Sequence, residues 1–225
     1  PIGYHGRSSS IGVSGQAFHR PRGQVKPPDA DAPSLKPSAR LDIELEMGVL
    51  IGQPNALGAP IGIDDAESHV FGLVLFNDWS ARDIQPWEYQ PLGPFLSKNF
   101  ASTVSPWVVT MDALEPFRVD TPKQEPAPLS YLKVDTANGL DLNLEVTLQS
   151  ASMDASQTIS RSNMKYLYWS MEQMLAHHTV TGCNMRTGDL CGTGTISGPT
   201  EDSYGSMLEL TWRGEKPITL PNNET

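Results

Sequence analysis

Apolar residues occur along this chain in short runs, and turn-forming residues separate the runs. The 225 residues include 19 glycines and 19 prolines, a frequency typical of short strands joined by turns. Apolar runs at residues 10–14, 41–51 and 70–77 predict strands. Residues 142–148 alternate apolar and polar side chains, as a half-buried strand does, and residues 207–212 alternate in the same way. The pattern therefore predicts a mainly β protein.

One segment has the period of a helix instead. Apolar side chains recur at the spacing i, i+3, i+4, i+7 at Met164, Leu167, Tyr168, Met171, Met174 and Leu175. Ser162 or Asn163 can cap the start of this helix, and Gly182 lies beyond its end. Residues 21–38 contain five prolines and predict an irregular surface loop. We find no repeat or linker, so residues 1–225 are predicted to form one α+β domain with one long helix.

The charge balance excludes some classes of partner. The formal net charge is -10, which argues against binding to nucleic acid or to an anionic membrane surface. No run of eighteen apolar residues is present to span a bilayer. Cys183 and Cys191 lack the spacing of a metal or redox motif and are interpreted as free thiols in the cytoplasm. The chain starts at Pro1 without a Met or an apolar signal segment, and we expect it to begin inside a longer protein.

Candidate chemistry begins with two glutamates in the second predicted strand. Side chains two residues apart in a strand share a face, so Glu44 and Glu46 should project side by side, together with Asp42. Adjacent carboxylates resist burial unless a cation lies between them, and Mg²⁺ and Ca²⁺ prefer oxygen ligands. Taken alone, the Glu-x-Glu pattern is more typical of a solvated strand face.

The third predicted strand ends in polar groups that strengthen the metal hypothesis. Asp78 supplies a third carboxylate, and Arg82 and Gln85 would share its face if a helical turn followed it. Further on, a segment rich in proline and glycine brings Lys98 and Ser102. Taken singly, Arg82 and Lys98 could be solvated surface charges, and Tyr89 could be a core side chain.

Together these segments resemble the fumarylacetoacetases, a branch of the fumarylacetoacetate hydrolase superfamily. The resemblance covers nearly the whole chain. It is carried by His5-Gly-Arg-Ser-Ser, Leu41-Asp-Ile-Glu-Leu-Glu-Met, Asn77-Asp-Trp-Ser-Ala-Arg-Asp-Ile-Gln, Pro91-Leu-Gly-Pro-Phe-Leu-Ser-Lys, Ser105-Pro-Trp-Val-Val, His177-His178, Gly188-Asp-Leu, Gly194-Thr-Ile-Ser-Gly and Gly205-Ser-Met-Leu-Glu-Leu. It implies the mixed β-sandwich or roll of the family's C-terminal catalytic domain, truncated at both ends. An N-terminal domain, a first catalytic segment and C-terminal strands would then lie outside the chain.

The resemblance also implies roles for individual residues. The implied metal ligands, for Ca²⁺ or Mg²⁺, are Glu44, Glu46 and Asp78, with Lys98 and Ser102 beside Asp78 at a second, Mg²⁺-associated position. The family usually has Thr in place of Ser102. The implied substrate contacts are Arg82, Gln85, Tyr89 and Thr195. Arg82, Gln85 and Lys98 would also stabilise negative charge during catalysis, and Glu209 would orient a catalytic histidine. That histidine lies upstream of the matched region in the family, so His5 is interpreted as structural, and His177 and His178 as capping a helix end.

The implied activity is hydrolysis of a carbon–carbon bond in a β-diketo acid, 4-fumarylacetoacetate, to fumarate and acetoacetate. This is the last step of tyrosine and phenylalanine breakdown, and the family suggests a cytoplasmic homodimer. Without the upstream histidine and a fourth carboxylate ligand, the chain alone is expected to be inactive. Alternatives are an acylpyruvate hydrolase, a decarboxylase, or a metal-binding fragment without catalysis. A serine hydrolase is disfavoured because no Gly-x-Ser-x-Gly motif is present.

Overall fold

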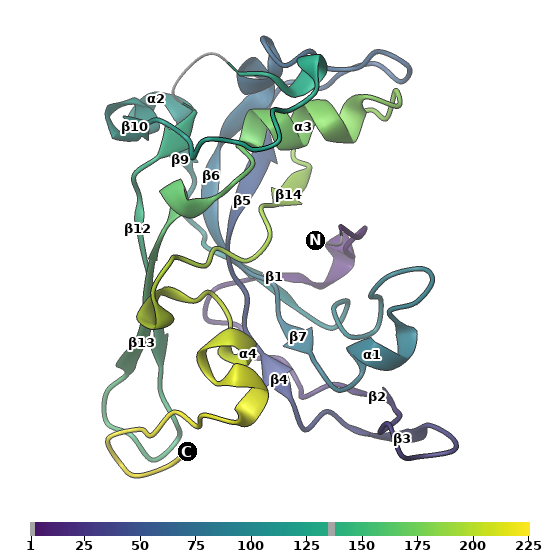
Figure 1. Cartoon of the computed structure of the whole chain (residues 1–225), viewed down its shortest axis with the longest axis vertical. Coiled ribbons are helices and arrows are strands. Elements are labelled where there is room, and N and C mark those ends of the chain that lie inside the picture. The colour runs from purple at the N-terminus through teal and green to yellow at the C-terminus, as the bar shows by residue number, and fades with distance from the viewer. Residues whose placement is uncertain (1–2, 135–137) are drawn as a thin grey trace.

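Strands make up most of the regular structure in the computed structural model, which describes residues 3–134 and 138–225 (Figure 1). Pro1, the start of the chain noted above, lies outside the described residues. The largest sheet has the strand order β1–β8–β6–β5–β14, and β9 also pairs with β6. Its strands are β1 (Ile11–Val13), β5 (Leu45–Ile51), β6 (Val70–Asn77), β8 (Ser102–Val104), β9 (Val109–Thr110) and β14 (Leu190–Gly192). The mainly β prediction is confirmed.

The strands β5 and β6 form the centre of this sheet because both are long and apolar. They pair antiparallel, with Met47 opposite Leu75 and Val49 opposite Leu73. Met47, Val49 and Leu73 belong to the main hydrophobic core, which also includes Met171 from helix α3 (Met171–Thr179). Burial of these side chains holds the helix over the sheet.

The predicted strand at residues 41–51 is interrupted near its start. β4 (Leu41–Asp42) pairs with β7 (Ser80–Ala81), whereas β5 begins only at Leu45. Between them, the Ile43 N–H donates to Asp42 Oδ1 at 2.8 Å, and the Glu44 N–H donates to Asn77 Oδ1 at 3.1 Å. The side chains of Asp42 and Asn77 thus replace the backbone carbonyls that a neighbouring strand would offer. The prediction of one continuous strand over residues 41–51 is therefore wrong.

Smaller sheets complete the β structure. Their strands are β2 (Arg22–Val25) with β3 (Ser34–Pro37), β10 (Arg118–Val119) with β11 (Gly139–Leu140), and β12 (Asn143–Leu148) with β13 (Gln157–Asn163). The predicted half-buried strand at 142–148 is therefore confirmed as β12. The irregular loop predicted at 21–38 is wrong, because β2 and β3 pair as an antiparallel hairpin in which Pro37 lies opposite Arg22. Pro37 ends its strand, a position that proline tolerates.

The predicted helix begins later than its periodicity suggested. Residues 164–166 form a 3₁₀ turn, and Leu167 is extended with ψ 128°. Ser170 then starts α3 with a capping box, in which its side chain accepts from the Gln173 N–H. The helix has nine residues, so the prediction of one long helix over residues 164–175 is not confirmed among the described residues.

The alternating segment at 207–212 does not form a strand. Residues Met207–Leu210 form the short helix α4, whose first turn is capped when Ser206 Oγ accepts from the Glu209 N–H. The other α-helices are α1 (Gln85–Glu88) and α2 (Met111–Leu114). The 3₁₀ turns are Ser8–Ser10, Ala66–His69, Glu115–Phe117, Ser130–Leu132, Met164–Tyr166, Glu201–Ser203 and Trp212–Gly214. Among the described residues, no helix has the length and apolar character needed to cross a bilayer.

Candidate metal and active site

Three carboxylates converge where β5 begins and β6 ends. Leu45 pairs with Asn77, so Glu44, just before β5, and Glu46, within it, lie beside Asp78, which directly follows β6. One oxygen from each of the three side chains lies within 4.8 Å of the others. Glu46 and Asp78 are buried, with 4 % and 3 % of their surface exposed. The predicted convergence of these side chains is confirmed, and their role as metal ligands stays a prediction.

Two cations approach the same carboxylates. Lys98 Nζ lies 2.5 Å from Glu44 Oε2 and 3.0 Å from Asp78 Oδ2, and it also donates to Ser80 Oγ at 2.7 Å. Arg82 Nη2 lies 2.9 Å from Glu44 Oε1. Lys98 is itself buried, so it is a partner of the cluster and not a solvated surface charge.

Of the three carboxylates, Glu46 is the one whose negative charge is least offset by nearby cations. Burial disfavours ionisation of Glu44, but Lys98 and Arg82 outweigh it and hold the pKa of Glu44 below its usual range. Burial, reinforced by Asp78 and Glu44, raises the pKa of Glu46 well above its usual range. Burial also raises the pKa of Asp78 in spite of Lys98. Without a further cation, the cluster therefore resists carrying three ionised carboxylates beside Lys98 and Arg82.

The donor set fits a hard divalent cation. Asp78 Oδ1 is buried and, among the described residues, has no hydrogen-bond partner, which is costly for a carboxylate oxygen. Two oxygens on opposite sides of a Ca²⁺ ion are about 4.6–5.2 Å apart at normal bond lengths, so a spread of 4.8 Å is compatible with a shared ion. An all-carboxylate site favours Ca²⁺ or Mg²⁺ over softer metals.

Tyr4 belongs to this site, although the sequence reasoning missed it. Its hydroxyl donates to Asp78 Oδ2 at 2.6 Å, and Lys98 Nζ lies 5.7 Å from the centre of its ring. Burial, followed by the charge of Asp78, raises the pKa of Tyr4, so the phenol stays a donor. Tyr4 directly precedes the His-Gly-Arg motif of the family resemblance, and that neighbourhood was the available signal.

A pocket of about 500 Å³ adjoins the acidic cluster. Glu44 and Arg82 line it on one side, and Glu209 and Thr195 line it as well. The Glu209 carboxylate accepts from the hydroxyls of Ser197, at 2.9 Å, and Ser206, at 2.7 Å. The pocket thus joins residues from five segments: 44, 82, 166–168, 195–197 and, from the start of α4, 206 and 208–209.

Other predicted site residues are placed differently. Gln85 reaches the site through Arg82, whose Nη1 donates to Gln85 Oε1 at 3.4 Å, although β7 and not a helical turn follows Asp78. Ser102 begins β8 opposite Ile11. In the described part of the chain, the side chains of Tyr89 and Ser102 make no hydrogen bond or ion pair with the acidic cluster. Their predicted roles are not tested by these contacts.

Within residues 3–134 and 138–225, the histidines at the end of α3 contact other side chains and not the helix carbonyls that they were predicted to cap. His177 Nδ1 lies 2.9 Å from the Tyr131 hydroxyl, and His178 Nε2 lies 3.6 Å from Cys183 Sγ. The ring of His5 lies 6.2 Å from that of His178. None of these histidines is among the described residues that line the 500 Å³ pocket.

We expect the substitution Gly192→Ala to weaken binding of Ca²⁺ or Mg²⁺ by roughly tenfold. A Cβ atom at this position would lie 2.7 Å from Glu46 Oε2 and 3.2 Å from Phe76, so the Glu46 carboxylate, which accepts from the Gly194 N–H at 3.0 Å, must shift from its place. Titration calorimetry on the full-length protein measures the change. Gly62→Ala is the control, because its nearest atom would be 3.8 Å away. Equal affinities in the two variants would contradict the placement of Glu46 in the metal site.

Comparison with known proteins places the chain in a family. Residues 1–217 match the family description "fumarylacetoacetate (FAA) hydrolase C-terminal". The chain is 60 % identical over 222 residues to the fumarylacetoacetase of Dictyostelium discoideum, covering 98 % of this chain and 52 % of that protein. It is 57 % identical over 225 residues to the human fumarylacetoacetase, covering 100 % and 54 %. The chain thus spans about half the length of the curated relatives it matches.

Solved structures share the fold at low sequence identity. A yeast fumarylacetoacetate hydrolase family protein superposes with a TM-score of 0.52 at 16 % identity, covering 86 % of this chain and 71 % of that one. A fumarylacetoacetate hydrolase from Exiguobacterium antarcticum gives 0.52 at 22 % identity, covering 84 % and 52 %. These matches support the fold alone. The family match over residues 1–217 shows more than the fold: the chain belongs to the fumarylacetoacetate hydrolase family.

Proposed function

We propose that this chain is the metal-binding catalytic part of a protein that hydrolyses 4-fumarylacetoacetate to fumarate and acetoacetate. The observation that carries the proposal is the buried acidic cluster of Glu44, Glu46 and Asp78, which opens through Glu44 onto a pocket lined by Arg82 and Glu209. The 54–60 % identity to curated fumarylacetoacetases across the chain supports this substrate.

Glu44, Glu46 and Asp78 would hold Ca²⁺ or Mg²⁺. When bound, such a cation polarises a carbonyl group and offsets negative charge that develops on it. Lys98 supports the site by its contacts with Glu44 and Asp78. Ser102 stays a predicted ligand of a second cation, beside Lys98 and Asp78.

The chain's other residues would act on the substrate. Water adds its oxygen to the fumaryl carbonyl carbon, the carbon–carbon bond breaks, and a proton ends on the carbon that becomes the methyl group of acetoacetate. Arg82 supplies N–H donors to the developing oxyanion, with Gln85 fixed beside it. Lys98, the other predicted donor, holds Glu44, Asp78 and Ser80 with its three N–H groups. Loss of one such donor typically costs roughly 10²–10³ in turnover.

Glu209 would orient the base and not remove the proton itself. Two serine hydroxyls donate to its carboxylate, which fixes its orientation in the pocket wall. A histidine, whose pKa lies near neutrality, is the suitable base for water, and Glu209 can accept its N–H. Thr195, in the pocket wall, and Tyr89 are the predicted substrate contacts. The family resemblance also predicts a cytoplasmic homodimer.

The proposal is tested by product analysis with the full-length protein. We expect fumarate and acetoacetate in equal amounts from fumarylacetoacetate, with turnover lost in EDTA and restored by Ca²⁺ or Mg²⁺. NMR identifies the products, and an acylpyruvate substrate assayed in parallel is the control. Faster cleavage of the acylpyruvate, or release of CO₂, would favour another activity of the superfamily.

A further inference from the structure

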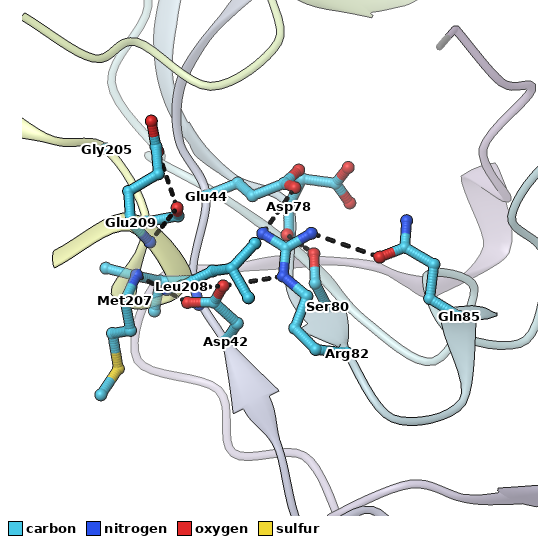
Figure 2. A network of polar contacts seen from close by, with 12 residues as sticks. Asp42, Glu44, Asp78, Ser80, Arg82, Gln85, Gly205, Met207, Leu208 and Glu209 are labelled. Carbon is cyan, nitrogen blue, oxygen red and sulfur yellow. Dashed lines mark hydrogen bonds and ion pairs between the residues drawn. The ribbon is translucent and has the colours of Figure 1, made fainter. Parts of the chain in front are cut away.

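One buried carboxylate connects the two sides of the pocket without belonging to the acidic cluster. Asp42 is 3 % exposed. Its Oδ2 accepts from Arg82 Nε at 2.7 Å, and its Oδ1 accepts from the Met207 N–H at 2.7 Å. Figure 2 shows Asp42 between the guanidinium of Arg82 and the start of α4, the helix that carries Glu209.

On the α4 side, Asp42 completes a helix end that cannot support itself. An isolated helix of four residues is not stable, and the first N–H groups of any helix lack partners within it. Asp42 accepts from the N–H groups of Met207 and Leu208, the latter at 3.2 Å. Ser206 Oγ accepts from the N–H of Glu209 at 3.3 Å. The backbone beneath Glu209 is therefore held through its whole first turn.

On the other side, Asp42 fixes the plane of the Arg82 guanidinium. The Nε–H of Arg82 is held by Asp42, which leaves Nη2 for Glu44 at 2.9 Å and Nη1 for Gln85 at 3.4 Å. The guanidinium donors have a rigid fork geometry. Holding Nε therefore decides where both remaining nitrogens point.

We propose that Asp42 is a positioning residue that sets the Arg82 guanidinium and the Glu209 carboxylate relative to each other across the pocket. This inference rests on the proposed function, in which Arg82 contacts the substrate and Glu209 orients the base. Asp42 acts through these two residues and contacts neither substrate nor metal. Oδ2 accepts from Arg82 and from the Leu208 N–H, and Oδ1 accepts from the Met207 N–H. An amide in place of the carboxylate keeps only one of these two acceptors, so it cannot hold both Arg82 and the whole first turn of α4.

The test is the substitution Asp42→Asn in the full-length protein. We expect kcat on fumarylacetoacetate to fall about 10- to 100-fold, while the Kd for Ca²⁺ or Mg²⁺ changes less than about threefold, because Asp42 is not among the converging carboxylates. The matched control is Asp83→Asn. Asp83 follows Arg82 in sequence and accepts from Ser38 Oγ at 2.6 Å and from the Ala39 N–H at 2.8 Å, so its loss should leave kcat within about twofold. Parent-like turnover by Asp42→Asn would overturn the inference.

A double-mutant cycle separates positioning from a general loss of structure. Arg82→Lys removes the donor that Asp42 holds, because lysine lacks the fork of arginine. If Asp42 acts through Arg82, the loss in kcat caused by Asp42→Asn should shrink by at least about threefold in the Arg82→Lys background. The same fold-loss in both backgrounds would indicate a merely structural role and overturn the inference.

A structural measurement keeps the inference testable apart from the proposed function. If the parent protein does not cleave fumarylacetoacetate, the proposed function fails, and crystal structures of the parent and the Asp42→Asn variant then decide about Asp42. We expect the Arg82 guanidinium or the first turn of α4 to shift in the variant. If both stay in place, the inference is wrong. If Asp42→Asn fails to fold, the variant Asp42→Glu replaces it. Glutamate keeps the charge and moves it by one methylene group. The same measurements and criteria then apply.

Discussion

Replacement of Lys98 by methionine should lower the unfolding free energy of the metal-free protein by about 3–5 kcal/mol. Lys98 is 4 % exposed and is the cation that Glu44 and Asp78 share, at 2.5 Å and 3.0 Å. Methionine fills a similar volume with a flexible apolar side chain. The expected loss therefore comes from the buried Asp78 and the half-buried Glu44 left without their shared charge, and not from a cavity.

The loss of unfolding free energy in Lys98→Met should also depend on bound cation, which gives a second test. Ca²⁺ or Mg²⁺ bound between the same carboxylates offsets their charge and stabilises only the folded state, so a saturating cation should recover part of the loss. Urea unfolding in EDTA and in excess cation measures both values. Lys123→Met is the control, because its side chain is 87 % exposed and 3.9 Å from Glu125, and we expect a change below about 0.5 kcal/mol. A loss below about 1 kcal/mol for Lys98→Met in EDTA would contradict the prediction.

The substitution Glu46→Gln should change metal affinity and stability in opposite directions. Loss of this proposed charged ligand should weaken Ca²⁺ or Mg²⁺ binding by at least about 100-fold, since even the loss of a supporting contact costs 10- to 100-fold. The metal-free protein should become more stable by roughly 1–3 kcal/mol at pH 7. Glutamine keeps the acceptor for the Gly194 N–H and removes repulsion from Glu44 and Asp78.

The gain in stability should depend on pH in a defined direction. Burial and the two neighbouring carboxylates raise the pKa of Glu46 above its ordinary value of 4.5, so the folded state keeps a proton that the unfolded chain has released. The stability of the metal-free parent therefore decreases as pH rises from about 4.5 towards the raised pKa, by up to about 1.4 kcal/mol per pH unit. Glu46→Gln removes this contribution, so its advantage should grow with pH over that window and vanish below it.

Unfolding curves in EDTA at several pH values, together with calorimetric titration of the cation, test both effects. Glu125→Gln is the matched control, because its side chain is 83 % exposed and its loss should change neither quantity. If Glu46→Gln destabilises the metal-free protein at pH 7, the Glu46 carboxylate is better compensated than its contacts indicate. Unchanged cation affinity would remove Glu46 from the metal site.

The carboxylate cluster could be predicted from sequence because strand periodicity is local. A spacing of two residues placed Glu44 and Glu46 together, and the polar end of an apolar strand identified Asp78. The helix and strand errors have local causes as well. Ser170 starts α3 with a capping box, a hydrogen-bond pattern that the spacing of apolar residues does not reveal. Residues 207–210 are too few to distinguish the two-residue period of a strand from the 3.6-residue period of a helix.

The contacts made across long sequence separations could not be predicted. Tyr4 donates to Asp78 from 74 residues away, and nothing in the spacing of either residue specifies that bond. Asp42 was expected beside the two glutamates, but the break before β5 lets it accept from Arg82 and from the backbone of α4, 165 residues further on. Such roles depend on which segments meet, and that is decided by the whole fold.

The assembly of the site from distant segments has a kinetic consequence. β14 pairs with β5, β1 pairs with β8, and the Leu45 N–H donates to the Gly205 carbonyl, so the site forms only after large loops of chain have closed. Loop closure costs entropy before the contacts form, and proteins rich in such non-local pairings fold slowly. During refolding, cation binding and turnover should therefore return together with the last native contacts. A partly folded chain would expose its glutamates and lysine to water as ordinary charges, without the affinity that comes from bringing them together.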